Sequence, residues 1–256
     1  MTRRLPLFLT AIVSLTLVVH AQTRLTFDVA SIRSSNADNL NGGIKPLPGG
    51  YGYTAQNIPV KLMISLMYRV PMRQIKSAPE WLNTERFDVE AKADRAYSVE
   101  DLHIMYQNML IDRFNLKFHM ETKQGNIYSL TVDPSGLKMK PNDSPQDFNI
   151  PVNFAPNGFV GHRVPMPYLC WFLGQQLQND ERPVVDQTGL KGNYDFNLSF
   201  TPPRPPDVTK EDSGAPLDDR PSIYDALREQ LGLKLQAEKG PVTYLVIDSI
   251  QKPSDN

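Results

Sequence analysis

Histidine and cysteine are the side chains best suited to metal binding or nucleophilic catalysis in this 256-residue chain. Beyond residue 21, His103, His119 and His162 lie far apart and lack the short spacing at which paired ligands hold a metal ion. Cys170, the only cysteine, stands in the apolar run 168–172 without a basic neighbour that would stabilise its thiolate. We therefore expect no metal and no cofactor, and we expect Cys170 to pack as a small apolar side chain.

A hydrolytic site could be assembled only from residues that are distant in the sequence, because the chain has no Gly-x-Ser-x-Gly motif. His162, Asp186 and Asp195 are the candidates for such a site. Residues 186–192 also have the composition of a tight turn between two strands, which is the interpretation favoured for Asp186. The sequence thus assigns no catalytic residue, and it favours a protein that is not an enzyme.

Three aromatic residues are the candidates for binding. Tyr51 and Tyr53 flank the end of a glycine-rich segment, residues 34–53, and Trp81 precedes a predicted strand. Exposed aromatic rings beside loops can stack on sugars or contact peptides. The alternative is that Tyr53 and Trp81 only cover the edge of a sheet.

The elements that would position these residues form a pattern that occurs twice. In the first copy, an extended segment ends at Pro59, the apolar run 62–68 predicts a helix, and residues 86–91 alternate as a strand. A second helix is predicted after Ser98, with its apolar residues at helical spacing. It leads into a hairpin over residues 114–133.

The second copy repeats this order from Pro165 onward. An apolar helical run covers 168–173, a strand covers 193–198, and a helix begins after Ser222. A hairpin over 231–248 follows, with Gly232 at the left-handed position that ends a helix. Chance similarity between two ordinary α+β halves is the alternative to a repeat.

The predicted fold is therefore α+β, with two tandem similar modules of strand-helix-strand-helix-hairpin order and helices packed on a mostly antiparallel sheet. The first module covers 22–140, a polar linker covers 141–157, and the second module covers 158–256. Within the second module, residues 201–221 are rich in proline and charge and are expected to form an extended loop.

The N-terminus has the composition of a secretory signal peptide, residues 1–21. Arg3 and Arg4 precede an apolar stretch over 5–19, and cleavage is expected between Ala21 and Gln22. The apolar stretch is short for a membrane span, although an uncleaved anchor is the alternative. We expect an exported protein, periplasmic or extracellular, with no membrane span in the mature chain.

Charge argues against nucleic acid as a partner. The net charge of the whole chain is −1, and removal of Arg3 and Arg4 lowers it by two, to −3. A nucleic-acid-binding protein of this size normally carries a basic face.

The sequence resembles a family of exported proteins of soil bacteria, usually called soil-associated proteins and defined by a domain of unknown function. The resemblance extends from Phe27 to Pro253, and its most specific stretches are residues 78–81, 86–92, 109–117, 182–196 and 226–235. It implies no catalytic residue, because the family has no assigned activity. In some proteins a similar domain follows a membrane peptidase of the antibiotic-sensing type, which implies recognition outside the membrane. The end of each copy also looks like a small domain of secretins and outer-membrane receptors.

Taken together, these features favour a non-enzymatic recognition module of the envelope or extracellular space. Its partner would be a protein, peptide or glycan bound in or beside the cleft between the modules. A secreted hydrolase with a site built from distant residues and a structural envelope component are the two alternatives.

Overall fold

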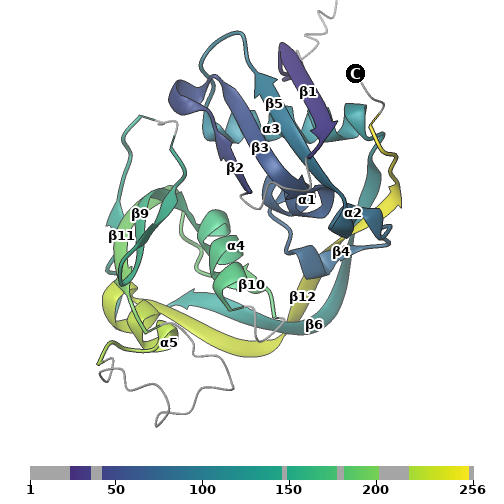
Figure 1. Ribbon diagram of the computed structural model, residues 1–256. Helices are drawn as coiled ribbons and strands as arrows, with labels where there is room; N and C mark the ends of the chain where they lie inside the picture. Colours follow the sequence, from purple (N-terminus) through teal and green to yellow (C-terminus); the bar gives the residue numbers. More distant parts are fainter. Residues whose placement is uncertain (1–23, 36–41, 146–148, 178–181, 202–218, 254–256) are drawn as a thin grey trace, which may run out of the picture.

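The computed structural model describes residues 24–35, 42–145, 149–177, 182–201 and 219–253. In this part of the chain, three four-stranded sheets combine with helices, and all but two of the strand pairs are antiparallel (Figure 1). The predicted α+β class is confirmed. Two lobes result, each with its own sheet, and one long ribbon of two strands runs beneath both.

The first lobe is built on a sheet with the order β1-β5-β3-β2. Its strands are β1 (Val29–Ser34), β2 (Gly43–Pro46), β3 (Gly52–Pro59) and β5 (Arg86–Lys92). Phe87 and Val89 of β5 are buried, as their period-two pattern predicts. Strand β2 lies within residues 34–53, which the sequence indicated to be one loop. Its glycine and proline content suits an edge strand, where a proline displaces no ladder hydrogen bond.

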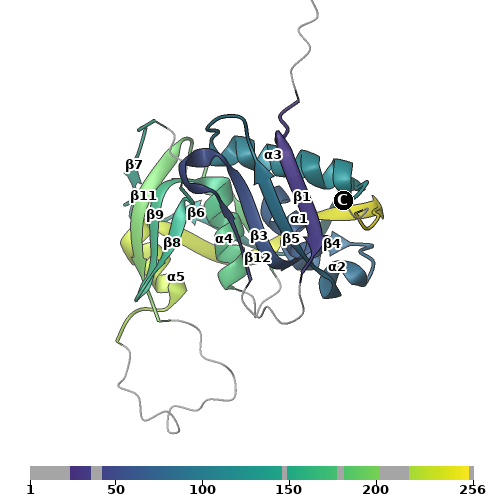
Figure 2. The same ribbon diagram turned by 45° about the horizontal axis from the view of Figure 1, so that its top comes forward.

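The second lobe repeats this sheet order with β7-β11-β9-β8. Its strands are β7 (Lys140–Pro141), β8 (Val152–Ala155), β9 (Gly158–Pro165) and β11 (Asn193–Ser199). The two sheets lie on opposite sides of α4 in Figure 2. Strand β8 falls inside residues 141–157, so the segment expected to be a linker contributes an edge strand. The shared order is compatible with two similar modules.

Prolines and serines start the helices in both lobes. Pro59 and Pro165 remain extended, with φ of −70° and −76°, and the helices begin at the next residue, Val60 or Met166. Ser98 and Ser222 accept hydrogen bonds from the third following backbone N–H, as expected of N-caps. The helices are α1 (Val60–Tyr68), α2 (Trp81–Thr84), α3 (Val99–Arg113), α4 (Met166–Gln176) and α5 (Ile223–Ala226), with 3₁₀ turns η1 (Pro48–Gly50) and η2 (Met72–Gln74) and the π-helical turn η4 (Leu227–Leu231).

The prediction of a hairpin at the end of each module is wrong. Each is one uninterrupted strand, β6 (Lys117–Val132) and β12 (Leu233–Ser249), and these two strands pair with each other along nearly their whole length. Gly125 and Gly240, which resemble turn residues, face each other in the ribbon. A Cβ on Gly125 would lie 2.8 Å from Val242 Cγ2, and one on Gly240 would lie 2.3 Å from Ile127 Cδ1. The glycines therefore make room for packed side chains rather than for turns.

Short parallel strands extend the ribbon on its two outer sides. β4 (Ile75–Lys76) pairs with β12 at Leu245, and β10 (Val184–Asp186) pairs with β6 at Tyr128. The first strand comes from the first lobe and the second from the second lobe. Each lobe is thus attached to the strand that the other half of the sequence provides.

Two separate hydrophobic cores reflect this exchange. Leu245 and Ile247, near the end of β12, belong to the core of the first lobe. Tyr128 and Leu130, near the end of β6, belong to the core of the second lobe. Neither core is complete without a strand from the other half of the chain.

Two predicted segments lie outside the described residues. These are the signal peptide, residues 1–21, and most of the proline-rich loop, residues 202–218. Within the described ranges, none of the helices has the length and apolar character needed to cross a membrane.

Truncation of Leu245 should destabilise the first lobe although the residue belongs to the second half of the sequence. Leu245 is fully buried, so Leu245→Ala is expected to lower the free energy of unfolding by about 2–5 kcal/mol. Its cross-strand partner Met120 is 48% exposed, and Met120→Ala should cost less than about 1 kcal/mol. Urea denaturation measures both values, and equal effects would contradict the shared core.

Candidate functional site

A β-bulge in each lobe shapes the strand that leads into α1 or α4. The register of β3 on β5 and that of β9 on β11 shift at equivalent points, a few residues before the helix. Asn57 and Arg163 occupy these bulges with φ of 54° and 51°. Asn tolerates the left-handed region because its short side chain can form local hydrogen bonds, whereas Arg has no such compensation. Arg163 therefore adopts a backbone conformation that is unfavourable for arginine.

In the first lobe, an aspartate holds the bulge in place. The backbone N–H of Asn57 donates to Asp88 Oδ1 at 2.9 Å, and the hydroxyl of Ser35 donates to the same oxygen at 2.6 Å. Asp88 thus ties the bulge to the end of the neighbouring edge strand β1.

The second lobe has the same arrangement around Asp195. The backbone N–H of Arg163 donates to Asp195 Oδ1 at 2.8 Å, and the Asn142 amide donates to both carboxylate oxygens at 2.9 and 2.8 Å. Desolvation would raise the pKa of Asp195, but these hydrogen bonds outweigh it and the pKa is lowered. A carboxylate in the same place in the first lobe shows that this aspartate has a structural role.

Within the described residues, the structure brings two of the three hydrolase candidates, His162 and Asp195, close together. Its Nδ1 lies 3.2 Å from Asp195 Oδ1, and its side chain is 55% exposed. His162 borders two cavities of about 390 Å³ each. No serine, threonine, tyrosine or cysteine is among the described residues that line either cavity. The pair therefore lacks the nucleophile that a catalytic triad requires.

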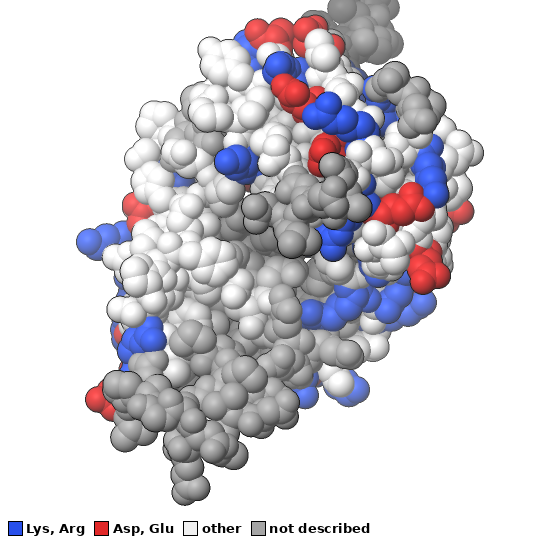
Figure 3. Space-filling model, in the orientation of Figure 1, with Lys and Arg blue, Asp and Glu red and all other residues white. Residues whose placement is uncertain are grey.

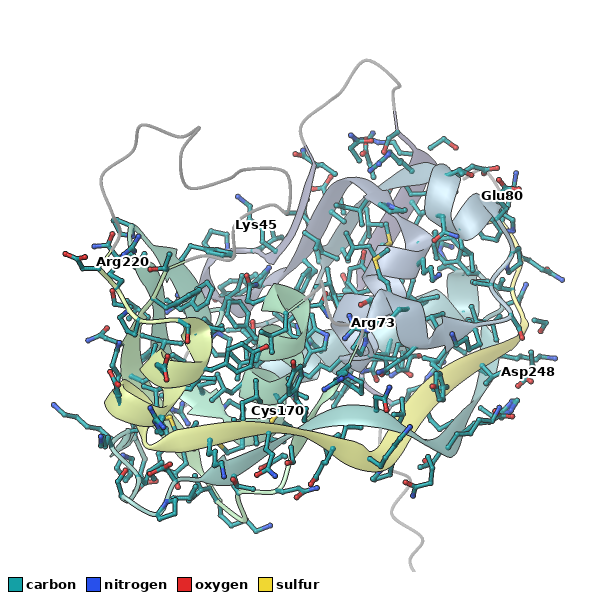
Figure 4. The ribbon with its side chains drawn as sticks, turned by 90° about the horizontal axis from the view of Figure 1, so that it is seen from below. Lys45, Arg73, Glu80, Cys170, Arg220 and Asp248 are labelled. Atoms are coloured by element: carbon teal, nitrogen blue, oxygen red, sulfur yellow. The ribbon has the colours of Figure 1, made fainter. Side chains whose placement is uncertain are left out.

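The other reactive residues have structural surroundings. Asp186 Oδ1 accepts hydrogen bonds from the backbone N–H and the hydroxyl of Thr188, which is the turn that its sequence indicated. Cys170 is buried in α4, and desolvation raises the pKa of its thiol far above the ordinary range, so it packs as predicted. Figure 4 places Cys170 close to the ribbon, away from the outer surface.

Residues of both lobes line one of the two cavities that His162 borders. It opens between the start of α3 in the first lobe and the bulge of β9 in the second. Its volume of about 390 Å³ is in the range of small-ligand sites. The described residues that line it are Arg69, Val99, Glu100, Asn149, Pro151, His162, Arg163, Pro165 and Asn193. We refer to this cavity as the inter-lobe cleft.

Arg69 connects the two walls of the inter-lobe cleft. It ends α1 in the left-handed conformation, with φ of 53°. Its guanidinium forms an ion pair with Glu100 and lies over the ring of Tyr168, 5.5 Å from the ring centroid. Because α4 contributes Tyr168, this contact spans the lobes. A second contact of this kind joins Arg73 Nη2 to the carbonyl of Arg182 at 2.9 Å, and Figure 4 shows Arg73 between the lobes.

Arg163 differs from Arg69 in its electrostatic surroundings. Its Nε is buried and has no hydrogen-bond partner in the described part of the chain. Of the two nearby carboxylates, Glu100 is paired with Arg69, and Asp195 accepts the backbone N–H of Arg163 rather than its guanidinium. The Nε–H of Arg163 therefore has no acceptor among the described residues, although the positive charge of its side chain also helps to lower the pKa of Asp195.

A buried tyrosine–histidine pair lies behind the first wall of the inter-lobe cleft. Tyr53 Oη is 3.1 Å from His103 Nε2, and both side chains are buried. Desolvation, reinforced by the nearby charge of Arg69, lowers the pKa of His103 to about 4. His103 is therefore neutral, and its hydrogen bond with Tyr53 fixes the start of α3 against β3.

The three predicted binding aromatics do not form one surface. Tyr53 is 4% exposed, with its ring packed edge-on against Tyr106. Tyr51 is 55% exposed, and Trp81 is half-buried against Phe87. Tyr53 thus lies in the core on an inner strand, neither on a binding surface nor at the edge of the sheet, and Tyr51 and Trp81 remain separate candidates outside the inter-lobe cleft.

Sequence reasoning missed Arg69 and Arg163, the two cations of the inter-lobe cleft. A signal for both was present, because each occupies a position where glycine or asparagine is usual. Arg69 ends a helix just before Pro71, and Arg163 stands where the first copy has Asn57. An arginine at such a position, where its backbone is disfavoured, draws attention to what its side chain contacts.

On the face shown in Figure 3, charged side chains gather over the first lobe and the ribbon, while the second lobe has fewer of them.

Residues 61–250 match the model of the family described as protein of unknown function DUF3738, and the chain belongs to this family. The match extends from α1 to the end of β12, so it includes parts of both lobes and the ribbon. No curated protein and no solved structure matches the chain. The family description names no activity, and the function is therefore argued from the site itself.

Loss of the carboxylate at position 195 should weaken the fold, because the backbone N–H of Arg163 and the side-chain amide of Asn142 would lose their acceptor. Asp195→Ala is expected to lower the free energy of unfolding by about 1–3 kcal/mol, and Asp88→Ala by a similar amount. His162→Ala, at an exposed side chain, should cost less than about 0.5 kcal/mol. Urea denaturation tests this, and an Asp195→Ala protein of unchanged stability would argue against the structural role.

Acid should destabilise the protein through His103. The folded pKa of about 4 lies below the ordinary value of 6.5, so the unfolded chain binds more protons between these pH values. This contribution to stability is complete above pH 6.5 and is lost as pH falls toward 4, by at most about 3 kcal/mol. His103→Asn should flatten the pH dependence of urea denaturation in this window, and an unchanged slope would contradict the assignment.

Proposed function

We propose that this protein is a non-enzymatic recognition module that binds a ligand in the inter-lobe cleft. The observation that carries the proposal is the lining of that cavity, which combines charged and amide side chains from both lobes with no hydroxyl or thiol among its described residues. Such a set can form hydrogen bonds and ion pairs but offers no hydroxyl or thiol nucleophile. The geometry around His162 supports the same conclusion, because Asp195 is engaged by the bulge.

The volume of the inter-lobe cleft limits the ligand. About 390 Å³ accommodates a small molecule or one terminal unit of a polymer, not the face of a folded protein. Of the partners that the sequence suggested, a peptide end or a sugar unit is therefore favoured over a whole protein.

We further propose that recognition takes place outside the cytoplasm, in the periplasm or extracellular medium, after removal of residues 1–21. The support is the N-terminal sequence, with Arg3 and Arg4 before a short apolar stretch and a small residue at Ala21. The resemblance to exported soil-associated proteins, and to domains that follow membrane peptidases of the antibiotic-sensing type, also agrees with recognition at the cell envelope.

Blocking the inter-lobe cleft should abolish ligand capture without unfolding the protein. The chain from Gln22 onward, the expected mature form, would be immobilised and exposed to envelope extracts of a bacterium that encodes it. Asn193→Trp fills the cleft, whereas Asn126→Trp places the same side chain on the exposed ribbon as a control. Mass spectrometry should find a ligand on the wild type and on Asn126→Trp that is missing from Asn193→Trp.

Two outcomes would overturn the proposal. Identical captured material on all three proteins would show that the inter-lobe cleft is not the site. Turnover of an ester, peptide or glycan panel by the wild type, lost in His162→Ala, would establish the hydrolase alternative.

A further inference from the structure

The guanidinium of Arg163, with its unpartnered Nε–H, points to the chemical nature of the ligand. Arg163 keeps a left-handed backbone at φ 51°, in a bulge where the other lobe has asparagine. Arg163 lines the inter-lobe cleft, and its Nε is buried without a partner among the described residues. A buried N–H donor without an acceptor is unfavourable, and an anion bound at the guanidinium would supply acceptors for its donors.

Other lining residues narrow the kind of anion. The described lining contains no phenylalanine, tyrosine or tryptophan, so a stacking surface of the kind that commonly binds sugars is lacking. Asn193 provides an amide group that can pair with a peptide backbone, and Pro151 and Pro165 provide rigid apolar contacts. Glu100, bonded to Arg69, makes the opposite side unfavourable for a second negative charge.

We propose that the inter-lobe cleft binds the C-terminal carboxylate of a peptide, with Arg163 as the residue that contacts it. A guanidinium matches the two oxygens of a carboxylate, and capture of a terminal carboxylate is a known mode of peptide recognition. This inference rests on the proposed function, because it specifies the ligand of the same cleft. It assigns to Arg163 a role that explains its cost to the backbone.

Peptides with and without the terminal charge provide the test. A pool of N-acetylated tripeptides would be prepared once as free acids and once as C-terminal amides, and each would be titrated into ¹⁵N-labelled protein from Gln22 onward. The acid pool should shift the Nε–Hε resonance of Arg163, and the amide pool should leave it in place. Arg163→Asn should weaken binding of the acids about tenfold or more, and Arg163→Lys should weaken it less.

Stability provides an independent control in the same experiment. Arg163→Asn introduces the residue that the first lobe already has at its bulge, so its thermal midpoint should be equal to or above that of the wild type. Arg228→Gln, at an exposed ion pair on η4, should leave peptide binding unchanged. Loss of binding in a fully folded Arg163→Asn protein therefore identifies a binding role rather than a structural one.

The contrary results are distinguishable. Equal binding of acid and amide pools, or no binding of either, overturns the carboxylate inference while cleft-dependent capture from extracts still stands. Binding of oligogalacturonate but not of the acid peptides would assign the site to an acidic glycan and overturn the peptide. If the Asn193→Trp variant captures the same ligand as the wild type, the proposed function itself is wrong.

Discussion

The pairing of β6 with β12 is the interaction on which the rest of the structure depends. Each strand starts in the core of the lobe that precedes it in sequence and ends in the core of the other lobe. Burial of Leu245 in the first core and Leu130 in the second therefore couples the two lobes through apolar contacts rather than through a flexible linker. We infer that the halves fold as one unit, in contrast to independent tandem domains.

This coupling is what gives the inter-lobe cleft a defined shape. The ribbon holds the lobes together below, and the contact of Arg69 with Tyr168 joins them at the cleft itself. Each wall of the cleft belongs to one lobe, and the ribbon and the contact of Arg69 with Tyr168 fix the two walls relative to each other. Asp88 and Asp195 accept hydrogen bonds from the backbone of the two bulges and so fix the strand ends from which α1 and α4 begin.

Local signals in the sequence predicted local structure well and long-range pairing badly. The caps at Ser98 and Ser222, the left-handed Gly232 and the alternation of β5 depend on neighbouring residues and were found. The ribbon depends on partners more than a hundred residues apart, and Gly240-Pro241 looks locally like a turn. The inter-lobe cleft was missed for the same reason, because Arg69 and Arg163 are far apart in the sequence and line one cavity only in the folded protein.

Differences between the two lobes carry more information about function than their similarities do. Asp88 and Asp195 perform the same task, so the presence of His162 beside Asp195 does not by itself indicate catalysis. At the bulge, by contrast, the first lobe has Asn57, which suits its backbone, while the second has Arg163, which does not. Because the first lobe forms the equivalent bulge with an asparagine, the bulge itself does not require an arginine, and the strained backbone of Arg163 directs attention to what its side chain does.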